Sequence, residues 1–133
     1  MERQLFQAAR KARARAHAPY SGFRVGAAIL ADDGSIHVGC NVENVAYPEG
    51  ICAETAAIAA MLTAGRRRIR EILVVGSGRA VTTPCGGCRQ RIREFASHAT
   101  VIHVCGPRGV AASFTVDELL PHAFGPDASG RRR

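Results

Sequence analysis

Three cysteines and one glutamate are the residues of this chain whose types and spacing best suit chemistry. Cys52 stands two residues before Glu54, and Cys85 and Cys88 follow in a Pro-Cys-Gly-Gly-Cys segment. A structural zinc site usually takes four protein ligands, whereas a catalytic site takes three and leaves the fourth position to water. Because the clustered ligands stop at three and a carboxylate stands beside them, the pattern predicts a catalytic zinc site with Glu54 as its proton carrier.

This donor set suits the addition of water to an electrophilic ring carbon and the departure of an amine as ammonia. Glu54 would take the proton of the water, deliver it to a ring nitrogen and help to protonate the leaving group. Zinc deaminases use such an arrangement, including a variant with three cysteines. A lone Cys-x-x-Cys would favour a structural zinc or redox motif, but the separate segment Cys52-Ala53-Glu54 argues against that interpretation.

The segments around these residues predict an α/β fold of about five strands with helices on its faces. Two β-prone runs joined by Asp32-Asp33-Gly34 predict a hairpin, Gly65 is placed to end the helix that carries Glu54, and Thr115–Glu118 fits a capping box. The predicted helices cover residues 2–16, 52–64 and 86–95, with a short one after residue 115, and the predicted strands cover residues 25–31, 36–41, 69–76, 100–105 and 110–114.

Both ligand segments lie where predicted helices begin, so the unpaired N–H groups and positive dipole ends of two helices should point toward the metal. This arrangement favours thiolates over thiols. Three thiolates with Zn²⁺ leave a formal charge of about −1, which weakens the acidification of water unless positive groups compensate. The helix ends are one source of compensation, and Arg89, directly after Cys88, is the candidate side chain.

The chain as a whole has the size and composition of one globular domain. It has 133 residues, of which 47% are hydrophobic and 22% charged, and we expect one catalytic domain over residues 1–126 and a basic, disordered tail over residues 127–133. The absence of a signal sequence and of a long apolar run predicts a cytoplasmic protein outside the membrane. There, clustered cysteines bind metal more often than they form disulfides, and Cys40 and Cys105 are expected to be small buried hydrophobic residues.

The net charge of +7 raises the question of nucleic-acid binding. The positive charge is concentrated in residues 10–15, on a predicted helix, in residues 66–70, between a helix and a strand, and in residues 131–133, in the tail. These segments contain no interleaved aromatic residues on which bases could stack. We therefore favour solvated surface charge over a nucleic-acid groove.

Over nearly its whole length, the sequence resembles the small homotetrameric cytidine deaminases. The resemblance rests on residues 23–28, 39–44, 47–54, 84–90 and 119–126. It implies that Phe23 lies against the pyrimidine, that Asn41 and Glu43 hold the ribose hydroxyl, and that the backbone of Ala53 meets the base carbonyl. It also implies that Phe124 reaches the pocket of a neighbouring subunit.

By this resemblance the fold is a three-layer α/β/α sandwich around a five-stranded mixed sheet, each subunit holds one zinc ion, and active sites are shared in a homotetramer. The implied reaction converts cytidine and 2′-deoxycytidine to uridine and 2′-deoxyuridine with release of ammonia, in pyrimidine salvage. Many family members carry an arginine directly after Cys-Ala-Glu, whereas this chain has Thr55. We expect Arg89 and the helix ends to carry more of the charge compensation here.

Three other functions fit parts of the pattern. A related deaminase could act on another aminopyrimidine nucleoside, as the blasticidin-type enzymes do, although residues 41–44 and 123–126 favour free cytidine. A nucleic-acid-binding or editing protein would use the basic surface and would bind RNA or DNA with a strong dependence on salt. A zinc-stabilised interaction module would have no catalysis, and Glu54→Ala would then change no activity.

Overall fold

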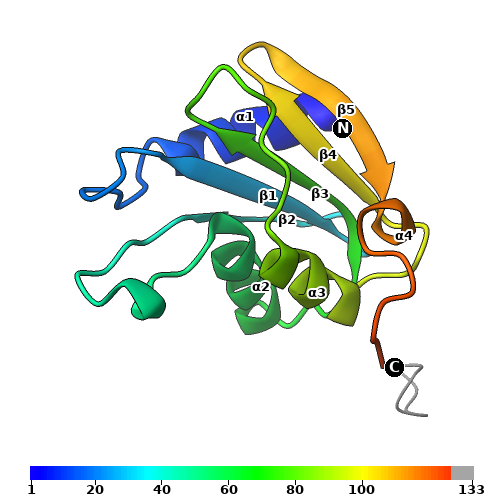
Figure 1. Ribbon diagram of the computed structural model, residues 1–133. Coiled ribbons are helices and arrows are strands. Elements are labelled where there is room, and N and C mark those ends of the chain that lie inside the picture. The colour runs from blue at the N-terminus through cyan, green and yellow to red at the C-terminus, as the bar shows by residue number, and fades with distance from the viewer. Residues whose placement is uncertain (127–133) are drawn as a thin grey trace.

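The fold is known from a computed structural model that describes residues 1–126, with five strands in one mixed sheet and helices on both of its faces (Figure 1). The expected disordered tail, residues 127–133, lies outside the described residues. In chain order the elements are α1 (Glu2–Arg13), β1 (Val25–Ala31), β2 (Ile36–Cys40), the 3-10 turn η1 (Tyr47–Glu49), α2 (Ala53–Thr63), β3 (Ile69–Gly76), α3 (Gly86–Glu94), β4 (Val101–Gly106), β5 (Gly109–Thr115) and α4 (Val116–Leu119).

The strands lie in the order β2-β1-β3-β4-β5. Strands β3 and β4 are parallel and are joined through α3, whereas the other neighbouring pairs are antiparallel. A parallel pair needs such a crossover, while β1 and β2 need only the tight turn in which Gly34 adopts a φ of 89°. The predicted hairpin and the predicted mixed α/β/α sandwich are therefore confirmed.

Alternate residues of β1 face two separate cores, as the period of two in a strand requires. Ala27 and Ile29 pack with α2 and α3 on one face of the sheet, and Ala28 and Leu30 pack with α1 on the other. Figure 1 shows α1 on one side of the sheet and α2 and α3 on the opposite side. The cysteine-bearing helices thus share one layer, and α1 forms the other.

Several element boundaries differ from the sequence prediction by one to three residues. Helix α1 ends at Arg13 instead of residue 16 because its last turn tightens into shorter-range bonds, such as that from the N–H of Ala16 to the carbonyl of Arg13. Strand β2 ends at Cys40, so Asn41 lies just beyond it. The predicted capping box of α4 is present at Thr115 and Glu118. None of the helices in the described part of the chain has the length and apolar character needed to cross a bilayer.

Candidate active site

Three cysteine sulfurs meet where two helices begin. Cys52 is the N-cap of α2, Cys85 is the N-cap of α3, and Cys88 lies in the first turn of α3. The three Sγ atoms lie within 4.8 Å of one another, and those of Cys52 and Cys85 are 3.9 Å apart. Sulfurs at tetrahedral positions about 2.3 Å from a zinc ion are about 3.8 Å apart. The cluster therefore fits one zinc ion, and the prediction that these cysteines come together is confirmed.

Glu54 lies in the first turn of α2, beside the sulfurs, and its side chain is buried. It lines a cleft of about 340 Å³ together with Cys52 and Cys85. Burial raises the pKa of Glu54 above its usual range. A raised pKa suits a carboxylate that must both accept and return a proton during one reaction.

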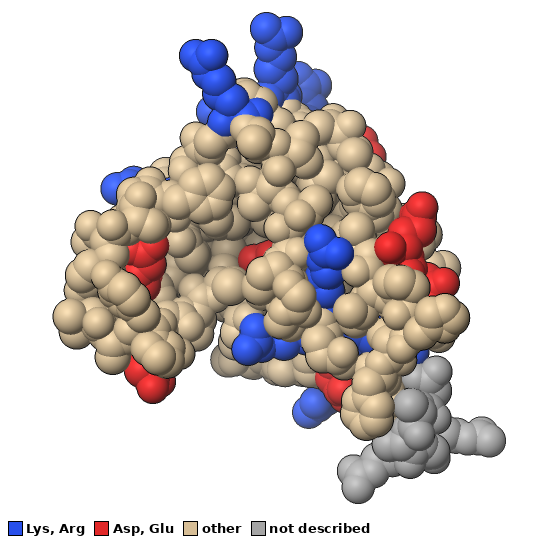
Figure 2. All heavy atoms as spheres, in the orientation of Figure 1, with Lys and Arg blue, Asp and Glu red and all other residues tan. Residues whose placement is uncertain are grey.

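The same cleft brings together residues from four separate segments of the chain. Phe23, Asn41, Glu43 and Ala53, all expected to hold the substrate, line it with Glu54. The space-filling view shows a hollow beside the segment that carries η1, with acidic atoms inside it (Figure 2). A cleft of this volume is in the size range of small-molecule sites.

Asn41 fixes the start of β1 and Phe23, which lies two residues before it. Its Oδ1 accepts a hydrogen bond from the N–H of Val25 at 2.8 Å, and its Nδ2 donates to the carbonyl of Phe23 at 2.9 Å. These two bonds hold the backbone on both sides of Arg24. Asn41 therefore positions Phe23 in addition to lining the cleft itself.

Glu43 holds the turn that precedes Phe23. Its Oε1 accepts the N–H groups of Tyr20 at 2.9 Å and Ser21 at 3.1 Å, and its Oε2 accepts the hydroxyl of Ser21. The Ser21 hydroxyl is the main reason why the pKa of Glu43 is lowered, and the two backbone donors add to it. The carboxylate is therefore ionised and oriented at the edge of the cleft.

The three thiols differ in acidity. Burial raises the pKa of Cys52 and, more strongly, that of Cys88, where the charge of Glu54 adds to the effect. Burial also acts on Cys85, but hydrogen bonds from the N–H and thiol of Cys88 and from the thiol of Cys52 outweigh it, so its pKa is lowered. A metal ion must displace protons from Cys52 and Cys88, so its affinity should rise with pH.

Comparison with known proteins decides the family. The family model "Cytidine and deoxycytidylate deaminase zinc-binding region" matches residues 1–104. Cytidine deaminases of Sporosarcina psychrophila and Mycobacterium tuberculosis H37Rv are both 42% identical to the chain, covering 90% and 94% of it and 88% and 90% of their own lengths. The chain belongs to the cytidine deaminase family.

Solved structures of cytidine deaminases agree with this assignment. The crystal structure of the Burkholderia pseudomallei enzyme aligns with a TM-score of 0.88 at 39% identity, covering 93% of this chain and 99% of that one. The Mycobacterium tuberculosis enzyme aligns with a TM-score of 0.82 at 40% identity, covering 92% and 96% of the two chains. The predicted fold class, the predicted zinc-dependent hydrolase class and the predicted zinc cofactor are confirmed with the family.

Two residues beside the cysteines bear on the charge of the three thiolates. The Thr55 hydroxyl lies 3.9 Å from the sulfur of Cys88, within hydrogen-bonding range for sulfur. Arg89, expected to offset thiolate charge, donates from Nε to the carbonyl of Pro84 at 2.8 Å and from Nη1 to that of Leu119 at 2.9 Å. Within the described residues its hydrogen bonds therefore go to the backbone next to Cys85 and to α4.

Phe124 lies apart from the residues that line the cleft within the described chain. Its side chain is 71% exposed, and its carbonyl accepts a hydrogen bond from Nε2 of Gln90 at 2.6 Å. That bond ties the C-terminal segment to α3, the helix that carries Cys85 and Cys88. Phe124 is therefore held beside the active-site helices with its ring exposed.

Sequence reasoning missed three residues of the cleft. Ser21, Thr82 and Thr83 line it, although all three lie outside the predicted helices and strands and outside the segments that carry the family resemblance. Thr82 lies close to Gly76 at the end of β3. A small hydroxyl residue in a loop has no pattern of its own, so only the folded chain could identify these residues.

Proposed function

We propose that this protein catalyses the hydrolytic deamination of cytidine and 2′-deoxycytidine to uridine and 2′-deoxyuridine with release of ammonia, as a cytoplasmic enzyme of pyrimidine salvage. The observation that carries the proposal is the burial of Glu54 in one cleft with Cys52 and Cys85, beside the fully buried Cys88. The relatives described above are cytidine deaminases, which favours this substrate over those of blasticidin-type or editing enzymes.

In this proposal Cys52, Cys85 and Cys88 hold the zinc ion. When bound, the ion supplies the Lewis acid that makes water a nucleophile at neutral pH. Glu54 takes a proton from the attacking water at its carboxylate, passes it to the ring nitrogen next to the amino-bearing carbon, and returns a proton to the departing amine. The raised pKa of Glu54 supports both directions of transfer.

The substrate is held by the walls of the same cleft. Phe23 lies against the pyrimidine ring, the N–H of Ala53 donates to the base carbonyl, and Asn41 and Glu43 bind the ribose hydroxyl. The position of Ala53 at the first turn of α2 supports its role, because N–H groups at a helix start lack partners within the helix. Glu43 keeps acceptor capacity for the sugar, because a carboxylate offers about four lone-pair sites and three are used here.

A homotetramer with shared active sites completes the proposal. Exposed hydrophobic side chains support it, because the rings of Phe124 and Tyr47 are 71% and 74% exposed and Val45 is 78% exposed. Tyr47 lines the cleft, so a neighbouring chain that covers it would also close the site. Phe124 would then enter the cleft of that neighbour.

The test compares Glu54→Gln with Glu49→Gln, an exposed acid in the preceding turn. Zinc content is measured by atomic absorption, and turnover of cytidine and deoxycytidine is followed by ultraviolet absorbance. We expect Glu54→Gln to retain zinc and to lose about 10³-fold or more in kcat, because it removes the proton carrier. Glu49→Gln should match the parent protein. Undiminished turnover in Glu54→Gln would refute the proposal.

A further inference from the structure

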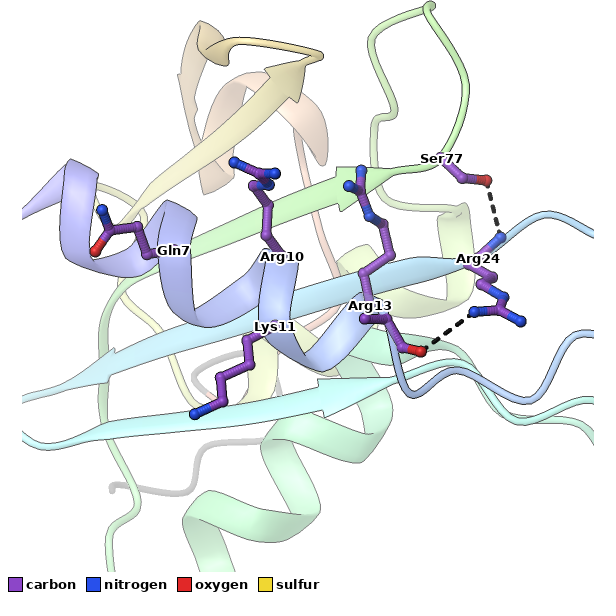
Figure 3. Close-up of a pocket in the computed structure, with 7 residues that line it drawn as sticks. Gln7, Arg10, Lys11, Arg13, Arg24 and Ser77 are labelled. Carbon is purple, nitrogen blue, oxygen red and sulfur yellow. Dashed lines mark hydrogen bonds between the residues drawn. The ribbon is translucent and has the colours of Figure 1, made fainter.

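A second cleft lies beside α1, on the opposite side of the sheet from the cysteines (Figure 3). Its volume is about 500 Å³, and its lining is strongly basic. Arg10, Lys11 and Arg13 come from α1, and Arg24 comes from the residue before β1. No carboxylate is among the described residues that line it. Four like charges around one hollow produce a positive potential that an anion would relieve.

The arginines share one part of this cleft. Figure 3 shows the guanidinium groups of Arg10 and Arg13 on one side of α1 and the ammonium group of Lys11 on the other. Arg24 lies at the end of the cleft next to Ser77. The arginine side is therefore the better candidate for a binding site, because planar guanidinium groups match the geometry of phosphate oxygens.

Two of the arginines are already held in place by the backbone. Arg13 donates from Nη1 to the carbonyl of Gly76 at 2.6 Å, and Arg24 donates from Nη1 to that of Ala14 at 3.2 Å. Each guanidinium carries five N–H donors, so each keeps donors for a ligand. Side chains ordered before binding lose less entropy when a ligand arrives, which favours affinity.

Arg24 and Ser77 offset a backbone feature that opposes an anion in this cleft. The carbonyl of Ala14 is at the C-terminal end of α1, where the helix dipole disfavours negative charge. Arg24 donates a hydrogen bond to this carbonyl, and its positive charge opposes the dipole there. Ser77 accepts the N–H of Arg24 through Oγ at 3.0 Å, so its own O–H can turn toward a ligand.

We propose that this cleft binds an oligophosphate anion, either free or as the phosphate chain of a nucleotide. The clustering of guanidinium groups in one hollow fits a compact polyanion better than an extended strand. The described residues that line the cleft include no aromatic ring on which successive bases could stack, which disfavours single-stranded nucleic acid. The site lies on the α1 face, so the proposal does not rest on the deaminase reaction proposed for the opposite face.

The test is isothermal titration calorimetry of the zinc-loaded, full-length protein with inorganic triphosphate at two ionic strengths. Arg10→Gln/Arg24→Gln removes two charges from the cleft, and the control Arg67→Gln/Arg68→Gln removes two exposed charges before β3. We expect saturable binding that weakens as salt screens the site. The cleft variant should bind at least about tenfold more weakly, and the control should stay within about twofold of the parent, because charged hydrogen bonds are lost only in the former.

Two further arms identify the source of the phosphate. Tighter binding of ATP than of triphosphate would assign the site to a nucleotide, and equal binding would assign it to the phosphate chain alone. Equal weakening in both variants, or no binding to the parent protein, would overturn the proposal. Tighter binding of a short single-stranded RNA that competes with triphosphate would also overturn it and show a nucleic-acid surface instead. Melting curves of both variants confirm that each is folded.

Discussion

Gly39 gives the sharpest test of how the sheet positions the active site. The residue lies in β2 directly beneath α2, and a methyl group at this position would lie 2.6 Å from the carbonyl oxygen of Ala53 and closer still to the N–H of Ala57. Ordinary contacts begin near 3.4 Å. In Gly39→Ala the N-terminal half of α2 must therefore move away from the sheet by about 0.8 Å or more, because a helix backbone cannot rotate aside as a side chain can.

The same movement would displace Cys52 and Glu54, which stand at the start of α2. A misplacement near 1 Å can cost about 10²-fold in rate, and overpacking of this kind costs about 1–3 kcal/mol in the free energy of unfolding. We expect Gly39→Ala to melt at a lower temperature, to bind zinc more weakly and to lose about 10²-fold in kcat/KM for cytidine. Zinc content and kcat/KM should be measured per folded protein, below the melting temperature.

Gly26 offers a matched control on the other face of the sheet. A methyl group there would lie 2.8 Å from the N–H of Arg13 and would also press on the carbonyl of Ala9, so Gly26→Ala forces α1 outward instead of α2. It should destabilise the fold by a similar amount and leave zinc content and kcat/KM within a few-fold of the parent. Equal losses of activity in Gly26→Ala and Gly39→Ala would refute the claim that the position of α2 sets the site.

Two further predictions concern single side chains. Ser21→Ala removes the main cause of the lowered pKa of Glu43, so this carboxyl should take up its proton at a higher pH in the variant. The stabilisation from the carboxylate is complete above its ordinary pKa and is lost as the pH falls through the folded-state value, so in the variant it should be smaller and its loss should be complete at a higher pH. An NMR titration of the carboxyl carbon tests this, with Ser35→Ala as a control far from the cleft, and an unchanged midpoint would contradict it. Arg89→Ala should lower zinc retention and turnover because its bonds to the backbone next to Cys85 and to α4 are lost, whereas Arg91→Ala should not. Equal zinc content and turnover in the two variants would show that Arg89 has no such role.

Local patterns predicted most of the fold because the signals for each element lie within it. The two β-prone runs and the Asp32-Asp33-Gly34 turn between them were sufficient for the hairpin, and the helix starts next to the cysteines followed from the ligand segments themselves. Strand order was harder, because the pairing of β3 with β1 and β4 joins segments that are distant in the sequence. The close approach of the α2 backbone to Gly39 could not be predicted either, because the sequence shows only that the residue is a glycine.

The candidate site was predicted as a set of residues but not as a set of contacts. The motif placed Asn41 and Glu43 near a ribose, whereas the structure shows that both also hold the segment from Tyr20 to Val25. Such bonds cross 16 to 23 positions of sequence, and nothing in the spacing of the residues specifies them. The hydrogen-bond partners of polar side chains in a site can therefore be identified only from the folded chain.

The charge of the three thiolates connects these observations to the fold itself. With Thr55 next to Glu54, the residue after the glutamate brings a neutral hydroxyl to 3.9 Å from the sulfur of Cys88, and a neutral group offsets less charge than a guanidinium would. Arg89 donates two of its N–H groups to backbone carbonyls, those of Pro84 and Leu119. We therefore expect the starts of α2 and α3 to provide much of the compensation, because Cys52 and Cys85 are the N-caps of those two helices. On this reasoning the packing of the two helix N-termini beside the cysteines should serve the zinc site electrostatically as well as geometrically, and weaker zinc binding is expected wherever either helix start is displaced.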